Sequence, residues 1–326
     1  AIFLAQDDEH FIPQVTRTDG GDGHAAIIYV THGEPPGYDP LPWILTMAEF
    51  DNDDVPFIPW PFRPFFFAAS RGEYAKVGGS PHNSLHETFI DNLRRAMPVA
   101  VANGTRFYLS FLDYPPHPEE MTVKAINEGA SKIIILPVFV TESTHTIAAQ
   151  EMVNAVNPQQ YGIEVNYTGA LGDSDTLQSV FVERANNLTV DYAKSDVGIL
   201  LIGHGQPDEW EDLYPEQNAQ ESAYRNGIRD KLIADGFSAD NVKLGWMSFQ
   251  EPSIATSAAA LAANEVEIII VCSVSLSAKS IHSLVDAPKG IEEANLPSDI
   301  LVEYVDQYGD HPLAIQAMAE KILPFL

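Results

Sequence analysis

Short apolar runs rich in Ile, Val and Leu alternate with longer segments of helical periodicity along most of the chain. The apolar runs lack polar alternation, which indicates strands buried on both faces, as helix-covered parallel sheets require. The first half predicts strands at 26–31, 106–111, 132–138 and 163–167, and helices at about 85–102, 118–128 and 146–156. The second half predicts strands at 197–202, 242–247, 266–272 and 300–304, and helices near 219–234, 254–263, 279–287 and 312–325. This alternation is typical of βαβ units.

The two halves also repeat each other in sequence. The segment IIYVTHGEP at 27–35 mirrors ILLIGHGQP at 199–207. Each half carries one histidine after its first predicted strand and another after its third. These histidines are His32, His145, His204 and His282. Because ligands bind at the carboxyl edge of open α/β sheets, we expect a cleft that gathers the four imidazoles.

The predicted fold class is therefore α/β, with two similar Rossmann-like lobes, each a parallel sheet flanked by helices, and a cleft between them. The length of 326 residues fits two domains. We expect a polar N-terminal extension at 1–24, a first lobe at 25–176 and a second lobe at 177–326.

Composition narrows the range of partners. The formal charge is −28, with only 18 Lys and Arg residues, which argues against nucleic acid and against adsorption to anionic lipid, since both need a basic surface. The acidic surplus favours solubility, a salty medium or the attraction of cations. No apolar stretch reaches the ~20 residues of a transmembrane helix. The single cysteine, Cys272, excludes an internal disulfide or a cysteine-rich metal site.

His204 is the strongest candidate for chemistry. It follows a buried strand, its flanking glycines leave room for a ligand near the backbone, and Pro207 fixes the turn. An imidazole there can act as a base near neutral pH or bind a metal, although a structural histidine fits the same short pattern. His282 could share a metal with His204. For His32 and His145, functional and structural roles are equally open.

Five segments in collinear order resemble the ferrochelatases. Residues 204–217 resemble the AHGLP…GDPYxxQ segment, and residues 74–81 (YAKVGGSP) resemble the YxxIGGxSP loop. The NLGTP motif is matched by residues 31–35, and the motif G-x-x-(R/K)…LPLYP by residues 129–138. The strand that ends in FQS is matched by residues 245–250. Each motif is weak alone, and five in order are specific.

The resemblance extends over roughly residues 26–310. It implies a chelatase-type fold that inserts a divalent metal, Fe²⁺ or Co²⁺, into a tetrapyrrole and needs no organic cofactor. In that family the histidine of HGLP lies over the macrocycle face, so His204 becomes the candidate base or metal ligand. A base is needed because pyrrole N–H groups lose protons as the cation enters, and ligands are needed because the cation sheds water.

The chain departs from the ferrochelatase pattern at the second histidine. His282 stands where ferrochelatases carry a glutamate, and Asp286 matches a following acidic position that could pass protons or cations. An imidazole at this point resembles the anaerobic cobalt chelatases and the sirohydrochlorin chelatases, relatives with paired histidine ligands. The departure leaves Co²⁺, Fe²⁺ and Ni²⁺ open, since neutral imidazole suits all three.

The segment FIPWPFRPFFF at 57–67, here called the aromatic lip, corresponds in ferrochelatases to an apolar rim around the macrocycle. Trp60, Phe62 and Phe66 are candidates for stacking, and Arg63 for a propionate. The prolines predict no regular helix or central strand here. Packing against the first lobe and weak peripheral membrane contact are the alternatives. The resemblance adds Tyr74, Ser80, Tyr214 and Gln217 as substrate-binding candidates.

Two functions fit these observations. The first is a ferrochelatase-like chelatase in which His204, His282 and Asp286 perform the chemistry. The second is a non-catalytic haem-, tetrapyrrole- or metal-binding protein on the same fold. The compartment is open: the resemblance implies the cytoplasm, and a processed N-terminus at Ala1 would imply the periplasm.

Overall fold

The computed structural model describes residues 12–17 and 23–326 and contains two four-stranded sheets. The first has the order β2-β1-β3-β4, with β1 (His24–Thr31), β2 (Arg106–Phe111), β3 (Ala130–Pro137) and β4 (Glu164–Tyr167). The second has the order β6-β5-β7-β8, with β5 (Val197–Gly203), β6 (Val242–Trp246), β7 (Ile268–Ser273) and β8 (Leu301–Tyr304). All neighbouring strands are parallel. The predicted fold class of two similar α/β lobes is confirmed.

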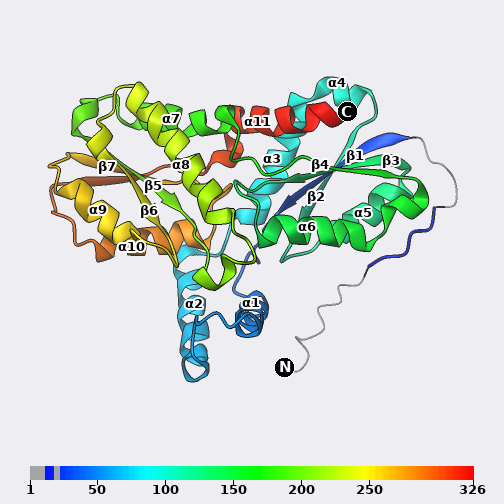
Figure 1. Ribbon diagram of the computed structural model, residues 1–326, viewed down its shortest axis with the longest axis horizontal. Coiled ribbons are helices and arrows are strands. Elements are labelled where there is room, and N and C mark those ends of the chain that lie inside the picture. The colour runs from blue at the N-terminus through cyan, green and yellow to red at the C-terminus, as the bar shows by residue number, and fades with distance from the viewer. Residues whose placement is uncertain (1–11, 18–22) are drawn as a thin grey trace.

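Helices flank both sheets. Their bounds are α1 (Leu41–Asn52), α2 (Arg63–Val77), α3 (His82–Ala96), α4 (Pro98–Ala102), α5 (Pro118–Asn127), α6 (Thr144–Ala155), α7 (Asp175–Leu188), α8 (Gln217–Ala234), α9 (Ile254–Ala262), α10 (Ala287–Glu293) and α11 (Pro312–Ile322). Figure 1 shows the sheets in two lobes, with α7 and α11 along one side of the molecule and α1 and α2 projecting from the opposite side.

All eight predicted strands are present within two residues of their predicted ends, but two predicted helices are wrong in detail. The helix expected at 85–102 is two helices, because Pro98 has no N–H to continue α3 and instead begins α4. The helix expected at 279–287 is a π-helical turn, His282–Asp286, followed by α10.

The prediction that the aromatic lip contains no helix is also wrong. Trp60–Phe62 forms a 3₁₀ turn, and Arg63 begins the fifteen-residue helix α2, which contains Phe66. Pro64 lies in the first turn of α2, where the missing N–H would have had no partner in any case. Gly78 ends the helix with a φ of 81°, a left-handed cap that glycine adopts without strain.

One hydrophobic cluster joins the two lobes. It contains Ile27 of β1 and Ile199 of β5, which occupy matching places in the two sheets, together with Leu93 of α3 and Met318 of α11, and all four are fully buried. Burial of such a side chain contributes about 1.5–3 kcal/mol. Helix α11 contacts α3 and β3 as well as α7. The C-terminal segment therefore packs against the first lobe, and the shared core fixes the relation between the sheets.

The N-terminal extension is only partly described. Residues 1–11 and 18–22 lie outside the described residues, and β1 begins at His24, the last position of the predicted extension. Within 12–17 and 23–326, no helix has the length and apolar character needed to cross a membrane.

Candidate metal-facing site

The two turns that follow β1 and β5 share one geometry. In the first lobe, Nδ1 of His32 lies 2.9 Å from the carbonyl oxygen of Gly33, and in the second, Nδ1 of His204 lies 2.8 Å from that of Gly205. Both glycines have positive φ, 94° and 81°. The sequence repeat thus corresponds to a structural repeat, with one imidazole held in the same way at the carboxyl end of each sheet.

The glycines beside His204 are required by the protein itself, which corrects the expectation that they make room for a ligand. A Cβ at Gly203 would lie 2.7 Å from the guanidinium carbon of Arg225. A Cβ at Gly205 would lie 2.3 Å from the carbonyl oxygen of Ser248. Real Cβ atoms do not approach so closely, so glycine is needed for the close packing of this turn.

The structure brings the predicted histidines together in two pairs. The ring centroids of His204 and His282 are 5.3 Å apart with planes at 87°, and those of His32 and His145 are 5.0 Å apart with planes at 36°. Two imidazoles that each hold one metal at about 2.0–2.1 Å through a ring nitrogen have centroids about 5 Å apart. Both pairs therefore have a separation compatible with a shared cation.

Hydrogen bonds at Nδ1 determine which ring nitrogen is available. Nδ1 of His282 lies 2.6 Å from Oδ2 of Asp286, and Nδ1 of His204 faces a carbonyl oxygen. Carboxylate and carbonyl oxygens only accept, so Nδ1 carries the proton in both rings and Nε2 keeps its lone pair. Within the described residues, Nε2 of neither ring has a hydrogen-bond partner. A histidine whose Nδ1–H is fixed in this way is the usual form of a metal ligand.

The two imidazoles of the second lobe have pKa values displaced in opposite directions. Burial, followed by the nearby charge of His282, lowers the pKa of His204, against the opposing charge of Glu221. Burial also disfavours the charged form of His282, but the hydrogen bond and charge of Asp286, with the charge of Glu34, raise its pKa above the usual value. The imidazole of His204 is thus the less basic of the pair, and that of His282 the more readily protonated.

The first-lobe pair has a different electrostatic setting. Nδ1 of His32 also lies 3.1 Å from Oδ2 of Asp113. Burial, with the charges of His32, His204 and His282, places the pKa of His145 well below its usual range. The charges of His204 and His282 act on His145, so the two pairs lie near each other across the two lobes.

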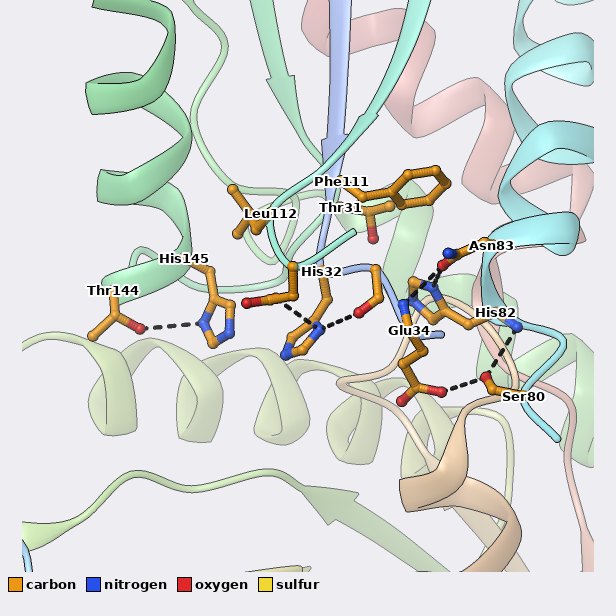
Figure 2. Close-up of polar contacts among 12 residues, drawn as sticks. Thr31, His32, Glu34, Ser80, His82, Asn83, Phe111, Leu112, Thr144 and His145 are labelled. Atoms are coloured by element: carbon orange, nitrogen blue, oxygen red, sulfur yellow. Dashed lines mark hydrogen bonds and ion pairs between the residues drawn. The ribbon is translucent and has the colours of Figure 1, made fainter. Parts of the chain in front are cut away.

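Glu34 is a site residue that the sequence interpretation missed (Figure 2). It extends from the first lobe, and its Oε2 accepts hydrogen bonds from the hydroxyl of Ser80 and from the backbone N–H of Ile281, 3.2 Å away in the second lobe. Next to it, Nδ1 of the buried His82 lies 3.1 Å from Oδ1 of Asn83. Glu34 lies in the repeated THGEP segment, and its polar side chain at a strand end was the available signal.

Two of the predicted substrate-binding residues lie beside Glu34. Ser80 donates its hydroxyl proton to that carboxylate. Tyr74, in the last turn of α2, is buried and packs edge-on against Tyr38 at 5.8 Å. Burial, together with the charge of Glu34, raises the pKa of Tyr74 above its usual value. Both side chains therefore lie near Glu34, which contacts the loop before His282.

Tyr214 and Gln217 lie at the start of α8. The carbonyl oxygen of Tyr214 accepts a hydrogen bond from Nε2 of Gln206 at 3.0 Å, and its ring packs edge-on against Trp210 at 6.1 Å. Oε1 of Gln217 is buried and has no hydrogen-bond partner among the described residues. Gln217 therefore offers an acceptor that a ligand donor could use.

The aromatic lip follows α1 and continues into the first turns of α2, and these two helices project from the body (Figure 1). Trp60 and Phe62 are 58% and 60% exposed, whereas Phe66 packs against Trp43 at 5.0 Å. Arg63 is not a free cation, because its guanidinium makes two hydrogen bonds to the carboxylate of Asp51, at 2.7 and 2.5 Å. Exposed aromatic side chains, including Phe65 at 72%, rather than the arginine, are therefore the lip groups available to a flat ligand.

The base of the lip contacts the second lobe. Phe50 lies edge-on to Trp210 at 5.3 Å, and Nε1 of Trp210 donates to Oδ2 of Asp53 at 3.0 Å. Phe57 contacts Phe249 at 6.1 Å. The lip and the end of α1 beside it thus contact the second lobe, while Trp60 and Phe62 stay exposed.

No group of three or more His, Cys, Asp or Glu side chains within residues 12–17 and 23–326 is arranged to hold a metal ion by itself. The candidate donors described above are the imidazole nitrogens of the two histidine pairs.

Comparison with known proteins supplies the family. The sequence model described as Ferrochelatase matches residues 26–324. No curated protein matches the chain. The structure of SirB from Bacillus subtilis with Fe³⁺ superposes with a TM-score of 0.57 at 13% identity, over 92% of this chain and 94% of that one.

Two further solved structures are similar. CbiX, described as the terminal enzyme for biosynthesis of siroheme in denitrifying bacteria, has a TM-score of 0.53 at 13% identity, over 93% of this chain and 99% of that one. The multi-domain protein DR2241 from Deinococcus radiodurans, described as structurally similar to chelatases, has a TM-score of 0.54 at 14% sequence identity. The match covers 93% of this chain and 54% of that one. At these identities the likeness shows a shared chelatase-type fold. Because the sequence match extends from 26 to 324, the chain belongs to the Ferrochelatase family.

Proposed function

We propose that this protein is a metal chelatase that inserts Fe²⁺ or Co²⁺ into a tetrapyrrole held between the two lobes, taken as residues 25–176 and 177–326. The observation that carries the proposal is the perpendicular pair of His204 and His282, with ring centroids 5.3 Å apart. Both Nδ1 atoms are bonded to acceptors, and neither Nε2 atom has a hydrogen-bond partner among the described residues.

The chemistry follows from the opposite pKa shifts of this pair. His204, neutral near pH 7, accepts a pyrrole proton or coordinates the incoming cation through Nε2. His282 holds its imidazole toward the same point and passes protons to Asp286, which is hydrogen-bonded to its Nδ1. The strongly acidic chain, at −28, raises the local concentration of divalent cations.

The macrocycle would stack on the exposed Trp60 and Phe62 of the lip, with Tyr74, Ser80 and the free acceptor of Gln217 contacting its edge. Stacking on two aromatic rings contributes about 0.5–1.5 kcal/mol for each ring beyond area burial. The likeness to SirB with Fe³⁺ and to CbiX, the terminal enzyme of siroheme biosynthesis, supports a sirohydrochlorin-like substrate over a porphyrin.

An absorbance titration tests the proposal. The wild-type protein is mixed with sirohydrochlorin or a metal-free porphyrin, each with and without Co²⁺ or Fe²⁺. Conversion to the metallated spectrum at a rate above the protein-free control supports chelatase activity. A spectral shift on binding without conversion would instead identify a tetrapyrrole carrier. No response to either macrocycle would contradict both functions.

A further inference from the structure

The two histidine turns differ in the carboxylates that accompany them: Asp113 lies at the ring of His32, whereas a carboxylate lies behind the backbone of the His204 turn. Glu221 on α8 is 2% exposed. Its Oε1 accepts a hydrogen bond from the backbone N–H of His204 at 2.5 Å, and its Oε2 accepts one from the N–H of Gly205 at 3.1 Å. Within the described chain, no side chain accepts a hydrogen bond from the N–H of His32 or of Gly33. The carboxylate is therefore specific to the second lobe.

Glu221 also reaches the second histidine-bearing loop. The hydroxyl of Ser275 donates to Oε1 of Glu221. Ser275 follows β7, in the segment that leads to His282. One carboxylate thus connects the loop that carries His204 with the loop that carries His282, although 78 residues separate the two histidines along the chain.

Stability alone does not account for a carboxylate at this position. A buried charge costs several kcal/mol unless its oxygens are satisfied, and apolar residues of similar volume are commonly as stable or more so. Within the described residues, Arg225, four residues later on α8, makes no hydrogen bond to Glu221: its Nη1 donates to the carbonyl oxygen of Gly245 at 2.7 Å, and its guanidinium lies 3.6 Å from the ring of Trp246. Its charge is nevertheless close, because burial lowers the pKa of Arg225 and the charge of Glu221 opposes that shift. Glu221 is instead satisfied by the two histidine-bearing loops.

We propose that Glu221 is a positioning residue that fixes the backbone of His204 relative to the loop of His282 and so sets the geometry of the metal-facing pair. The inference rests on the proposed function, since it concerns the cation that the pair receives. It distinguishes the second-lobe pair as the preorganised one, because among the described residues only the His204 turn has a carboxylate that accepts from its backbone N–H groups.

The variant Glu221→Gln tests this. The amide keeps the shape and one acceptor, but its NH₂ group faces N–H or O–H donors, so one of the three contacts is lost. We expect Co²⁺ affinity, measured by isothermal titration, to fall by about 10–100-fold, the range for outer groups that orient metal ligands. Binding of metal-free sirohydrochlorin should stay within about twofold of wild type, because the macrocycle contacts are untouched.

Two further variants complete the experiment. Glu119→Gln is the matched control, since Glu119 is also a helix glutamate with 2% exposure but lies on α5 of the first lobe. It should leave Co²⁺ affinity unchanged.

Ser275→Ala removes the link between the loops while leaving both backbone contacts of Glu221, and should weaken Co²⁺ binding about 3–10-fold, as the net contribution of one ordinary hydrogen bond implies.

The outcomes separate the two proposals. Wild-type Co²⁺ affinity in Glu221→Gln, with loss of binding in His204→Ala, overturns the positioning role and leaves the proposed function standing. Equal Co²⁺ binding by wild type and His204→Ala overturns the proposed function itself. If Glu221→Gln fails to fold, Ser275→Ala decides: unchanged affinity overturns the role, and weakened affinity with unchanged macrocycle binding supports it.

Discussion

Nδ1 of His282 lies 2.6 Å from Oδ2 of Asp286 within one π-helical turn, and this contact holds the pKa of His282 above its usual value. In the variant Asp286→Asn we expect that pKa to fall, so that protons compete less with a cation. The pH midpoint of Co²⁺ binding should move to lower pH. Affinity at pH 8.5 should fall about tenfold, because the imidazole loses the carboxylate that orients it.

Calorimetric Co²⁺ titrations between pH 5 and pH 8.5 measure both effects. Asp306→Asn, which removes a surface ion pair with Lys279, is the control and should leave both quantities unchanged. A midpoint that stays fixed in Asp286→Asn would show that this carboxylate does not tune His282.

Acid should destabilise the metal-free protein through its buried neutral histidines. Burial places the pKa of His86 well below its usual range, and the ring is fully buried against Tyr29 and Ser277. Since the folded pKa lies below the unfolded value of about 6.5, this contribution is complete above pH 6.5 and is lost as the pH falls. The loss reaches at most about 1.4 kcal/mol per pH unit for each such group. The raised pKa of His282 acts in the opposite direction, so protonation of this ring offsets part of that loss of stability.

Urea unfolding at pH 7.5 and pH 5.5 checks this. His86→Gln should be less stable than wild type at pH 7.5 but should lose less free energy of unfolding between the two pH values. An unchanged pH dependence in the variant would assign the acid sensitivity to other groups.

The exposed tip of the lip should bind the macrocycle and contribute little to folding. The double variant Trp60→Ala, Phe62→Ala removes side chains that are 58% and 60% exposed. We expect sirohydrochlorin affinity, followed by absorbance, to fall about 5–100-fold, as the loss of two stacking contacts implies. Co²⁺ affinity should not change, and Leu301→Ala, at 55% exposure, is the control. Unaltered macrocycle binding would remove the lip from the site.

Gly205→Ala should displace His204. The added Cβ meets the carbonyl oxygen of Ser248, and the φ of 81° is unfavourable for alanine. We expect a loss of about 1–3 kcal/mol in the free energy of unfolding, with weaker Co²⁺ binding in the molecules that remain folded. Gly37→Ala, where a Cβ meets no atom within 4 Å, is the control. Chemical denaturation with and without Co²⁺ separates the two effects.

The sheets and the histidine pairs could be predicted from sequence because local pattern determines both. Uninterrupted apolar runs mark buried strands, and the THGEP and GHGQP segments place His32 and His204 at equivalent strand ends. Parallel topology then brings His145 and His282 to the same edge.

Residues whose roles depend on tertiary contacts could not be predicted in this way. Glu221 lies on the same helix face as the buried Ile228 and Leu232, and only the fold shows that its oxygens meet the N–H of His204. Glu34 acts on the opposite lobe through Ile281, a contact with no local signature. The helix of the lip was missed because the prolines were read as breakers, although Pro64 lies in the first turn, where it is tolerated.

The most direct test of the central claim is the initial rate of Co²⁺ insertion into sirohydrochlorin by wild type, His204→Ala and a control, His311→Asn, whose side chain caps α11. We predict conversion by wild type and by His311→Asn, and a rate at least about 100-fold lower for His204→Ala, the contribution expected of a positioned base or ligand. A His204→Ala protein that inserts the metal at the wild-type rate would contradict the assignment of the second-lobe pair as the metal-facing site.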